Sequence, residues 1–237
     1  MRFIRKGGEP KALSDWKSAN RGLPDGSAFA AIPGDVKAVL REAMRREQGF
    51  LCADTMAQVD GPQGSHIEHI QPQWTCLDKA TDYQNMVLCI PEKGPCAFGA
   101  FAKAGVRVDE TNFVSPLNES CQRRLRYRFS GTVAPAEEDD KAAARTIALL
   151  ALNHPILISA RRDAIRVQGI VATHGRQARP LRGGISAAKA RRLCEEVLAP
   201  DASGRLPPYC VAVSQAAATY ARERELRARR LVAKPPQ

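Results

Sequence analysis

Apolar residues recur at helical spacing in several long stretches of this chain. From Asp35 onward they fall on one stripe that ends near Gly49, which predicts a helix with Asp35 as its N-cap. The same spacing predicts helices over residues 11–19, 136–152, 155–171, 186–198 and 210–232. Residues 22–34 contain three Gly and two Pro and predict a loop, and the polar interval 175–184 predicts a linker.

Two shorter regions have the pattern of β-hairpins. Residues 50–70, with turn-forming residues between 60 and 64, predict a hairpin whose returning strand ends in the string S-H-I-E-H-I-Q-P at residues 65–72. Residues 125–133 alternate Arg and apolar side chains around Gly131 and predict a second hairpin. Residues 81–88 predict a short helix or a loop, and a further helix is expected beyond Cys96. Together these elements predict an α+β fold.

The string at residues 65–72 places two imidazoles and a carboxylate within four residues, and Asn85 follows His69 by sixteen residues. This is the composition of a metal-assisted hydrolytic site. Glu68 can hold a divalent metal while neutral His69 takes a proton from water, and the metal stabilises the charge that develops on a phosphate. The alternative is a hydrogen-bonded surface turn without chemistry.

Cysteines bracket this string, with Cys52 before it and Cys89 and Cys96 after it. The order Cys, His-Glu-His, Asn, Cys, Cys resembles an HNH endonuclease. So do the opening M-R-F-I-R-K-G-G-E-P and the later stretches R-E-Q-G-F-L-C-A, L-R-Y-R-F-S-G-T-V and T-I-A-L-L-A-L-N-H-P. From residue 1 to about 167 the chain resembles the retron- and Septu-associated HNH family, whose type member is PtuB.

The resemblance implies an HNH ββα-metal finger embedded in a mainly helical domain, followed by a helical basic C-terminal extension. It divides the chain into an N-terminal helical segment (1–49), the finger (50–115), a hairpin and helical cap (116–174) and the extension (175–237). It assigns Glu68 as a ligand of a catalytic Mg²⁺ or Mn²⁺, His69 as the general base and Asn85 as the residue that orients the catalytic loop. His66 is an additional contact.

Lys103 lies where the family has a basic residue before a glycine, so the resemblance implies a phosphate contact there. The alternative for Lys103 is a solvated lysine in a loop. The family also has a His or Asp beside its last cysteine, whereas Cys96 is followed by A-F-G-A-F-A. No ligand lies at that position, and the candidates to replace it from farther along the chain are Asp109, Glu110 and Asn112.

The family's structural zinc begins with a Cys-x-x-Cys knuckle, but this chain has Thr55 in place of the second cysteine. Zinc sites of this type have four N or S ligands. Cys52, Cys89 and Cys96 supply three. Either the zinc has been lost or a fourth ligand completes the set, for which the candidates are Cys76, Cys121 and Asp54.

Positive charge is concentrated toward the end of the chain. The net charge is +11, and residues 176–237 carry thirteen Lys and Arg against five Asp and Glu. Such a balance attracts phosphate backbones, and Arg124, Arg126 and Arg128 are candidates for a phosphate track along one strand. The alternatives are the solvated face of a strand and, for the C-terminal charges, docking on an acidic protein.

The 237 residues, 44% of them hydrophobic, suffice for a buried core. Seven cysteines spread along such a chain favour a reducing compartment. The charged start of the chain lacks an apolar segment, and no stretch is long enough for a membrane span, so we expect a cytoplasmic protein with no membrane partner.

The family resemblance implies a PtuA-like SMC/ABC-type ATPase as partner, DNA or RNA as substrate, and in retron members a reverse transcriptase with its DNA–RNA product. The function it implies is a divalent-metal-dependent nuclease subunit of a bacterial anti-phage complex. The alternative, raised by the missing ligands, is a catalytically degenerate adaptor that binds the ATPase or nucleic acid without cleaving. A zinc peptidase is disfavoured because H-E-x-x-H is absent.

Overall fold

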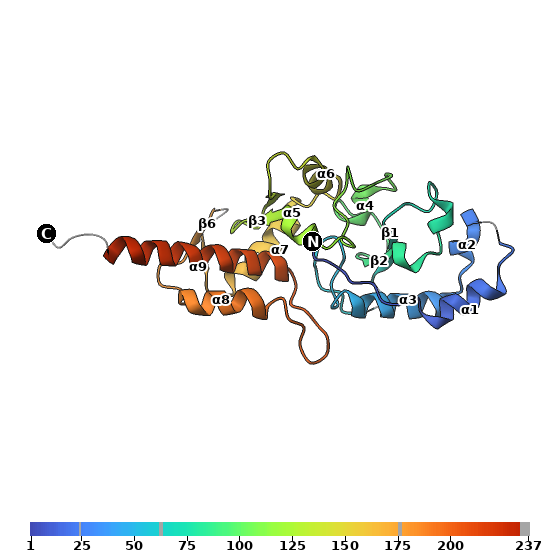
Figure 1. Ribbon diagram of the computed structural model, residues 1–237, viewed down its shortest axis with the longest axis horizontal. Coiled ribbons are helices and arrows are strands. Elements are labelled where there is room, and N and C mark those ends of the chain that lie inside the picture. Colours follow the sequence, from blue (N-terminus) through green and yellow to red (C-terminus); the bar gives the residue numbers. More distant parts are fainter. Residues whose placement is uncertain (24, 62–63, 175–176, 233–237) are drawn as a thin grey trace.

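The computed structural model describes residues 1–23, 25–61, 64–174 and 177–232 and is elongated (Figure 1). Helices and three two-stranded antiparallel sheets make up this part of the chain, which confirms the α+β class. In chain order the elements are α1 (Lys11–Ala19), α2 (Asp25–Ala31), α3 (Gly34–Glu47), β1 (His66–His69), η1 (Leu77–Lys79), η2 (Tyr83–Asn85), β2 (Met86–Cys89), α4 (Ala100–Lys103), α5 (Cys121–Arg124), β3 (Leu125–Tyr127), β4 (Val133–Pro135), α6 (Lys141–Leu149), α7 (Pro155–Arg166), β5 (Val171–His174), β6 (Gln177–Pro180), α8 (Ala187–Glu196) and α9 (Cys210–Val232).

The helices near the N-terminus differ from the prediction at two points. α1 has the predicted bounds, but α3 begins at Gly34 behind Pro33, so Asp35 lies in its first turn and is not the N-cap. The prediction of a loop over residues 22–34 is wrong for the described residues, because α2 forms there. Three of its last four residues are alanine, the strongest helix former, and this preference outweighs the nearby turn residues.

β1 pairs with β2 and not with residues 50–58, so the predicted 50–70 hairpin is wrong. Glu68 lies opposite Val87 and His69 opposite Met86, whereas residues 50–58 contribute a single antiparallel bridge. The sequence M-V-L-C of β2 is buried throughout, as a strand covered on both faces should be. The free edge of β2 is hydrogen-bonded by Gln48, the C-cap residue of α3. The Gln48 side chain donates to the Leu88 carbonyl at 2.9 Å and accepts from the Leu88 amide at 2.7 Å.

The predicted hairpin at 125–133 is confirmed as β3 and β4. Gly131 in its turn has φ +85°, and a Cβ there would lie 2.1 Å from the Ile158 carbonyl oxygen of α7. The turn is therefore pressed against the backbone of α7, a contact that only glycine allows.

The predicted helix boundaries after this hairpin are too wide. α6 starts only at Lys141, because the Asp140 side chain caps it by accepting from the Ala143 amide. α7 ends at Arg166, and Val171 belongs to β5. The interval predicted as a linker, 175–184, contains β6, which pairs with β5; residues 175 and 176 lie outside the described residues.

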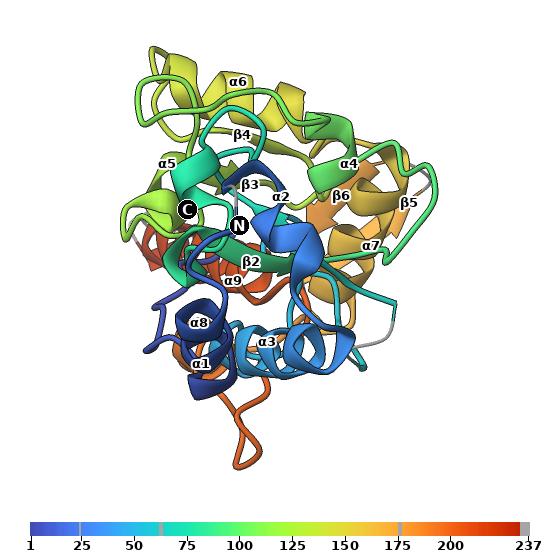
Figure 2. The same cartoon turned by 90° about the vertical axis from the view of Figure 1, so that its right-hand side faces the viewer.

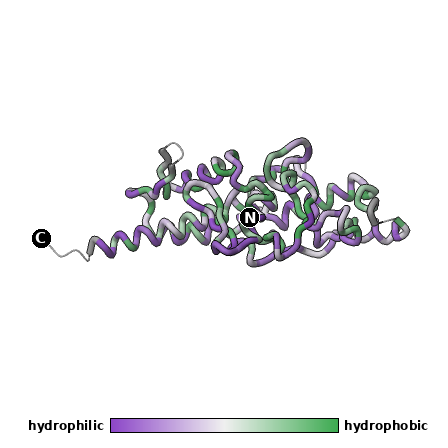
Figure 3. Tube along the Cα trace, turned by 90° about the horizontal axis from the view of Figure 1, so that it is seen from above, coloured by the Kyte–Doolittle hydropathy of each residue, from purple (hydrophilic) through white to green (hydrophobic). Residues whose placement is uncertain are grey.

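One cluster of buried hydrophobic residues runs from Met1 to Ala221 and takes members from all four segments proposed above. α8 packs against α9, and Figure 1 shows this pair at the end of the long axis away from α1 and α2. Figure 2 looks along that axis from the α1–α2 end, so that α8 and α9 lie behind. The outer part of α9 extends beyond the remaining chain, and hydrophilic residues dominate it (Figures 1 and 3). Within the described residues, no helix is both long and apolar enough to span a membrane.

Candidate functional site

The His-Glu-His motif forms β1, and its first two functional side chains contact α4. His66 packs against the Phe101 ring at 4.8 Å between centroids, and Glu68 forms an ion pair with Lys103 at 2.7 Å. The His66 Nδ1 atom lies 2.6 Å from the Pro91 carbonyl oxygen, which can only accept, so Nδ1 carries the hydrogen and Nε2 has the lone pair. That Nε2 atom is 3.8 Å from Glu68 Oε2, and both side chains are about one-fifth exposed.

His69 is held on the other side of β1. It is 4% exposed, its ring meets Phe29 of α2 edge-to-face at 4.6 Å, and Nε2 donates to the Ala80 carbonyl at 2.9 Å. Burial lowers the pKa of His69 against the opposing effect of the Ala80 bond, so the imidazole is neutral near pH 7. Its tautomer leaves Nδ1 as a proton acceptor.

Asn85 fixes the segment that connects β1 to β2. Its side chain accepts from the Gln71 amide at 2.8 Å and donates to the carbonyls of Gln71 at 2.9 Å and Lys79 at 3.2 Å. Lys79 immediately precedes Ala80, the partner of His69. Asn85 thus closes both ends of the loop that carries the His69 acceptor, the geometry expected of a residue that orients this loop.

Lys103 is buried at 2% exposure and does not reach the protein surface. Its ammonium donates to the backbone carbonyls of His69 at 2.8 Å and Ile70 at 3.2 Å, in addition to its ion pair with Glu68. A lysine has three N–H donors, and all three have acceptors here. This placement differs from both expectations for Lys103, the phosphate contact and the solvated lysine. The buried ammonium instead neutralises the Glu68 carboxylate from the protein interior.

Two of the three predicted zinc cysteines lie together, and both are buried. The Cys52 thiol accepts a hydrogen bond from Cys89, which lowers the pKa of Cys52 to about 6 and raises the pKa of Cys89. Cys89 Sγ is also 3.6 Å from a carboxylate oxygen of Asp54, whose pKa burial raises to about 7. The Thr55 side chain bonds to Cys52 as well.

The remaining cysteine candidates are Cys96, Cys76 and Cys121. Cys96 is only partly buried, Cys76 contacts Thr75 and Gln71, and Cys121 is buried at the start of α5. Across the part of the chain that the structure describes, no group of three or more His, Cys, Asp and Glu side chains is close enough to hold a metal ion. Cys52, Cys89 and Asp54 together offer two thiols and a carboxylate, and this set does not fit a zinc site with four N or S ligands.

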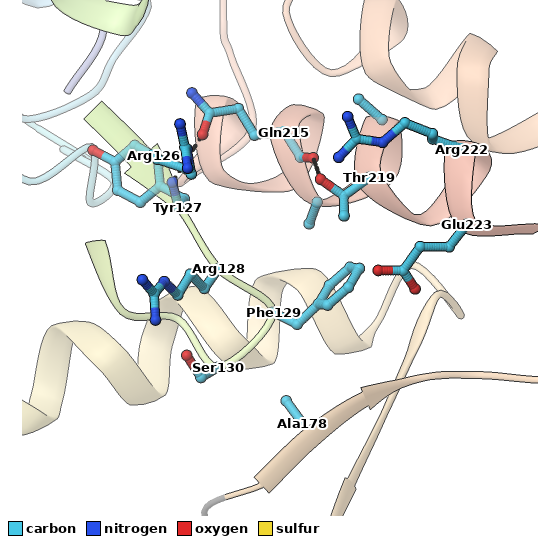
Figure 4. A pocket seen from close by; sticks show the side chains of 12 residues that line it. Arg126, Tyr127, Arg128, Phe129, Ser130, Ala178, Gln215, Thr219, Arg222 and Glu223 are labelled. Carbon is cyan, nitrogen blue, oxygen red and sulfur yellow. Dashed lines mark hydrogen bonds between the residues drawn. The ribbon is translucent and has the colours of Figure 1, made fainter. Parts of the chain in front are cut away.

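The three arginines of the predicted phosphate track have different environments. Arg124 makes a bidentate pair with Asp140, with bonds of 2.7 and 2.6 Å, so its guanidinium is already neutralised. Arg126 and Arg128 are exposed and line a cavity against α9 (Figure 4). Arg126 donates to the Ala136 carbonyl, and Arg128 has no ion-pair partner among the described residues. A track of three equivalent arginines is therefore not present.

No protein-family model matches this chain, and comparison with curated proteins finds no significant similarity. The resemblance to HNH endonucleases consequently rests on the sequence motifs, and the described elements do not confirm an HNH ββα finger.

Sequence reasoning missed three residues of this site. Phe29 covers His69, Phe101 covers His66, and Ala80 supplies the carbonyl that sets the His69 tautomer. Ala80 contributes through its backbone carbonyl, which every residue type has, so the sequence gives no signal for this contact. The two phenylalanines are ordinary core residues in pattern, and only the fold brings them to the motif.

Proposed function

We propose that this chain is an HNH-type nuclease subunit that hydrolyses phosphodiester bonds of DNA or RNA in a bacterial anti-phage complex with a PtuA-like ATPase. The observation that carries the proposal is the arrangement of His69, Ala80 and Asn85. A general base must be neutral, fixed in tautomer and held in place, and these three residues meet those requirements together.

In this proposal, His69 Nδ1 takes the proton from a water molecule as the water attacks the phosphorus atom. The Ala80 carbonyl then stabilises the imidazolium that forms, because it accepts from the opposite ring nitrogen. Asn85 acts through the loop and is a positioning residue. Phe29 covers the ring in this structure, and His69 lies on the side of β1 opposite to His66 and Glu68. Cleavage therefore requires α2 and the end of β1 to shift, so that water and substrate reach Nδ1 and the phosphate meets both sides of the strand.

The catalytic ion expected from the family is Mg²⁺ or Mn²⁺, and two donors at the site fit it. His66 Nε2 and Glu68 Oε2 lie on one side of β1 within the reach of a shared cation, and His66 donates its other nitrogen to a carbonyl, as metal-bound histidines do. When bound, such an ion neutralises charge on the scissile phosphate. Open sites of this kind take their other ligands from water and phosphate.

The experiment that tests the proposal is cleavage of labelled plasmid DNA and of total RNA with Mn²⁺ or Mg²⁺, by the chain alone and with its ATPase partner. His69→Ala should reduce cleavage by about 10²–10⁴-fold, the usual contribution of a general base. His154→Asn is the matched control, because His154 caps α7 through a hydrogen bond that asparagine can also make. Equal cleavage by wild type and His69→Ala would contradict the proposal.

Lys103 favours a second candidate, a degenerate HNH-like adaptor that docks on the ATPase or on nucleic acid without cleaving. The ammonium takes one oxygen of the Glu68 carboxylate, and His66 and His69 contact different helices. The adaptor predicts stable complex formation with the ATPase, no metal-dependent cleavage of either substrate, and no change in assembly when His69 is replaced. A retron reverse transcriptase with its DNA–RNA product is a further partner to include in the assembly test.

A further inference from the structure

A cavity of about 930 Å³ lies between the β3–β4 hairpin and α9, away from the His-Glu-His motif. Arg126, Arg128 and Phe129 line it from the hairpin, and Arg222 and Glu223 line it from α9. Figure 4 shows the guanidinium groups on facing walls, with the Phe129 ring between the hairpin and Glu223. Nothing in the candidate nuclease site uses these residues.

The two walls are fixed to each other. Gln215 of α9 accepts from the Tyr127 amide at 2.8 Å and donates to the Leu125 carbonyl at 2.9 Å, so it joins the helix to the edge of β3. On its other side the hairpin turn is pressed on α7 at Gly131. A cavity with rigid walls is preorganised, which limits the entropy lost on binding.

The charge in the cavity is not compensated from within. The side chains of Arg128 and Arg222 are exposed and have no ion-pair partner among the described residues, and Arg126 engages only a carbonyl. Against these three arginines the lining contains one carboxylate, Glu223. Neighbouring Arg124 shows the contrast, since Asp140 neutralises it.

A second basic cavity continues the first. It shares Glu223 and is lined by Arg182 and Arg227, together with two further arginines, Arg179 and Arg224. The two cavities thus form a path with seven arginines and one glutamate along α9. Positive charge spread over two neighbouring cavities suits a polymer of phosphates better than a single small anion.

We propose that this path binds the backbone of a single nucleic-acid strand, with Arg126, Arg128 and Arg222 at the phosphates and Phe129 stacked on a base. Positive grooves with an aromatic platform are the usual means of holding single strands. A duplex is too wide and stiff to enter a pocket between a hairpin and a helix, whereas one strand can follow it. The choice of nucleic acid as ligand rests on the proposed function, but binding here requires no cleavage.

The test is fluorescence anisotropy with labelled 15-nucleotide oligo-dT and oligo-rU, measured from low to high salt with the full chain. Each lost phosphate contact lowers the slope of log K against log salt by about 0.7 for single strands. Arg128→Gln/Arg222→Gln should lower the slope by about 1.4 and weaken binding about 25-fold at 0.1 M salt. Phe129→Ala should weaken binding about fivefold or more without changing the slope.

Arg229→Gln is the matched control, an exposed arginine of α9 that lines neither cavity. If it weakens binding as much as Arg128→Gln, charge on the helix and not the path determines affinity, and the proposal is overturned. Equal competition by duplex DNA or by poly-glutamate would overturn it too, in favour of a duplex or an acidic protein. Oligonucleotide binding that depends on Arg128 and Arg222, by a wild-type chain that cleaves neither DNA nor RNA, would contradict the nuclease proposal and leave this one standing. Cleavage without such binding would do the reverse.

Discussion

Asn85 and His69 are linked through one short stretch of backbone. Asn85 donates to the carbonyl of Lys79, and His69 donates to the carbonyl of the next residue, Ala80. The side chain that closes the loop and the imidazole that the loop holds therefore depend on two adjacent peptide groups. A change at Asn85 should reach His69 although the two side chains do not bond to each other.

Asn85→Ala should lower the free energy of unfolding by about 2–3 kcal/mol, since a buried side chain loses three hydrogen bonds and leaves backbone groups without partners. Urea denaturation measures this. Asn85→Asp should be no better at pH 7, because it keeps the acceptor for the Gln71 amide but places a carboxylate against two carbonyl oxygens. A fully stable Asn85→Asp would show that the donated bonds are unimportant.

Gly131→Ala should destabilise the protein by at least about 2 kcal/mol, because the new Cβ meets the backbone of α7 and the residue has positive φ. Gly64→Ala is the matched control: Gly64 has φ +83°, close to that of Gly131, but nothing lies within 4 Å of its Cβ position. The difference between the two melting temperatures isolates the contact with α7. Equal losses would show that only the backbone conformation matters.

The sequence was sufficient to predict those elements that depend on local residues alone. α1, α8 and α9 follow from helical spacing, and α8 has a local cap as well, since Ser186 accepts from the Lys189 amide. The hairpin around Gly131 has turn chemistry that reads directly from the residues. Such features need no information from distant parts of the chain.

Prediction from the sequence failed for features that depend on a contact with residues far away along the chain. The register of β1 depends on a strand that begins at Met86, and the short run M-V-L-C does not reveal by itself whether it is helix or strand. The position of Lys103 inside the site depends on how α4 docks, which no spacing encodes. Arg124 and Arg128 look alike in sequence, and only the position of Asp140 separates them.

Lys103→Met should have two effects. It should destabilise the protein by about 2–3 kcal/mol, somewhat less than for a fully buried pair because Glu68 retains access to water. It should also release Glu68, so Mn²⁺ raises the melting temperature of the variant more than that of wild type. Binding of the ion to the folded state alone is what produces such a rise.

The control for this prediction is Lys103→Met/Glu68→Gln, in which the ammonium and the carboxylate are both removed. It should recover part of the lost stability, since no buried charge is left without a partner, and it should not respond to Mn²⁺. A wild-type protein that Mn²⁺ stabilises as much as Lys103→Met would mean that the ammonium does not compete for Glu68.

Asp140→Ala should destabilise the protein by about 1–2 kcal/mol at pH 7, because this side chain caps α6 and pairs with Arg124. The hydrogen bond from Arg124 lowers the pKa of Asp140, so its contribution is present above the unfolded value of 3.8 and is lost as the pH falls through the lower folded value. Thermal melting of wild type and variant should thus differ at pH 7 and converge toward pH 2. Arg124→Ala should lose only the stability that comes from the ion pair. Its nucleic-acid binding should remain at the wild-type level, since Asp140 already neutralises the Arg124 guanidinium in the wild-type protein. Weakened binding in Arg124→Ala would return Arg124 to the phosphate track.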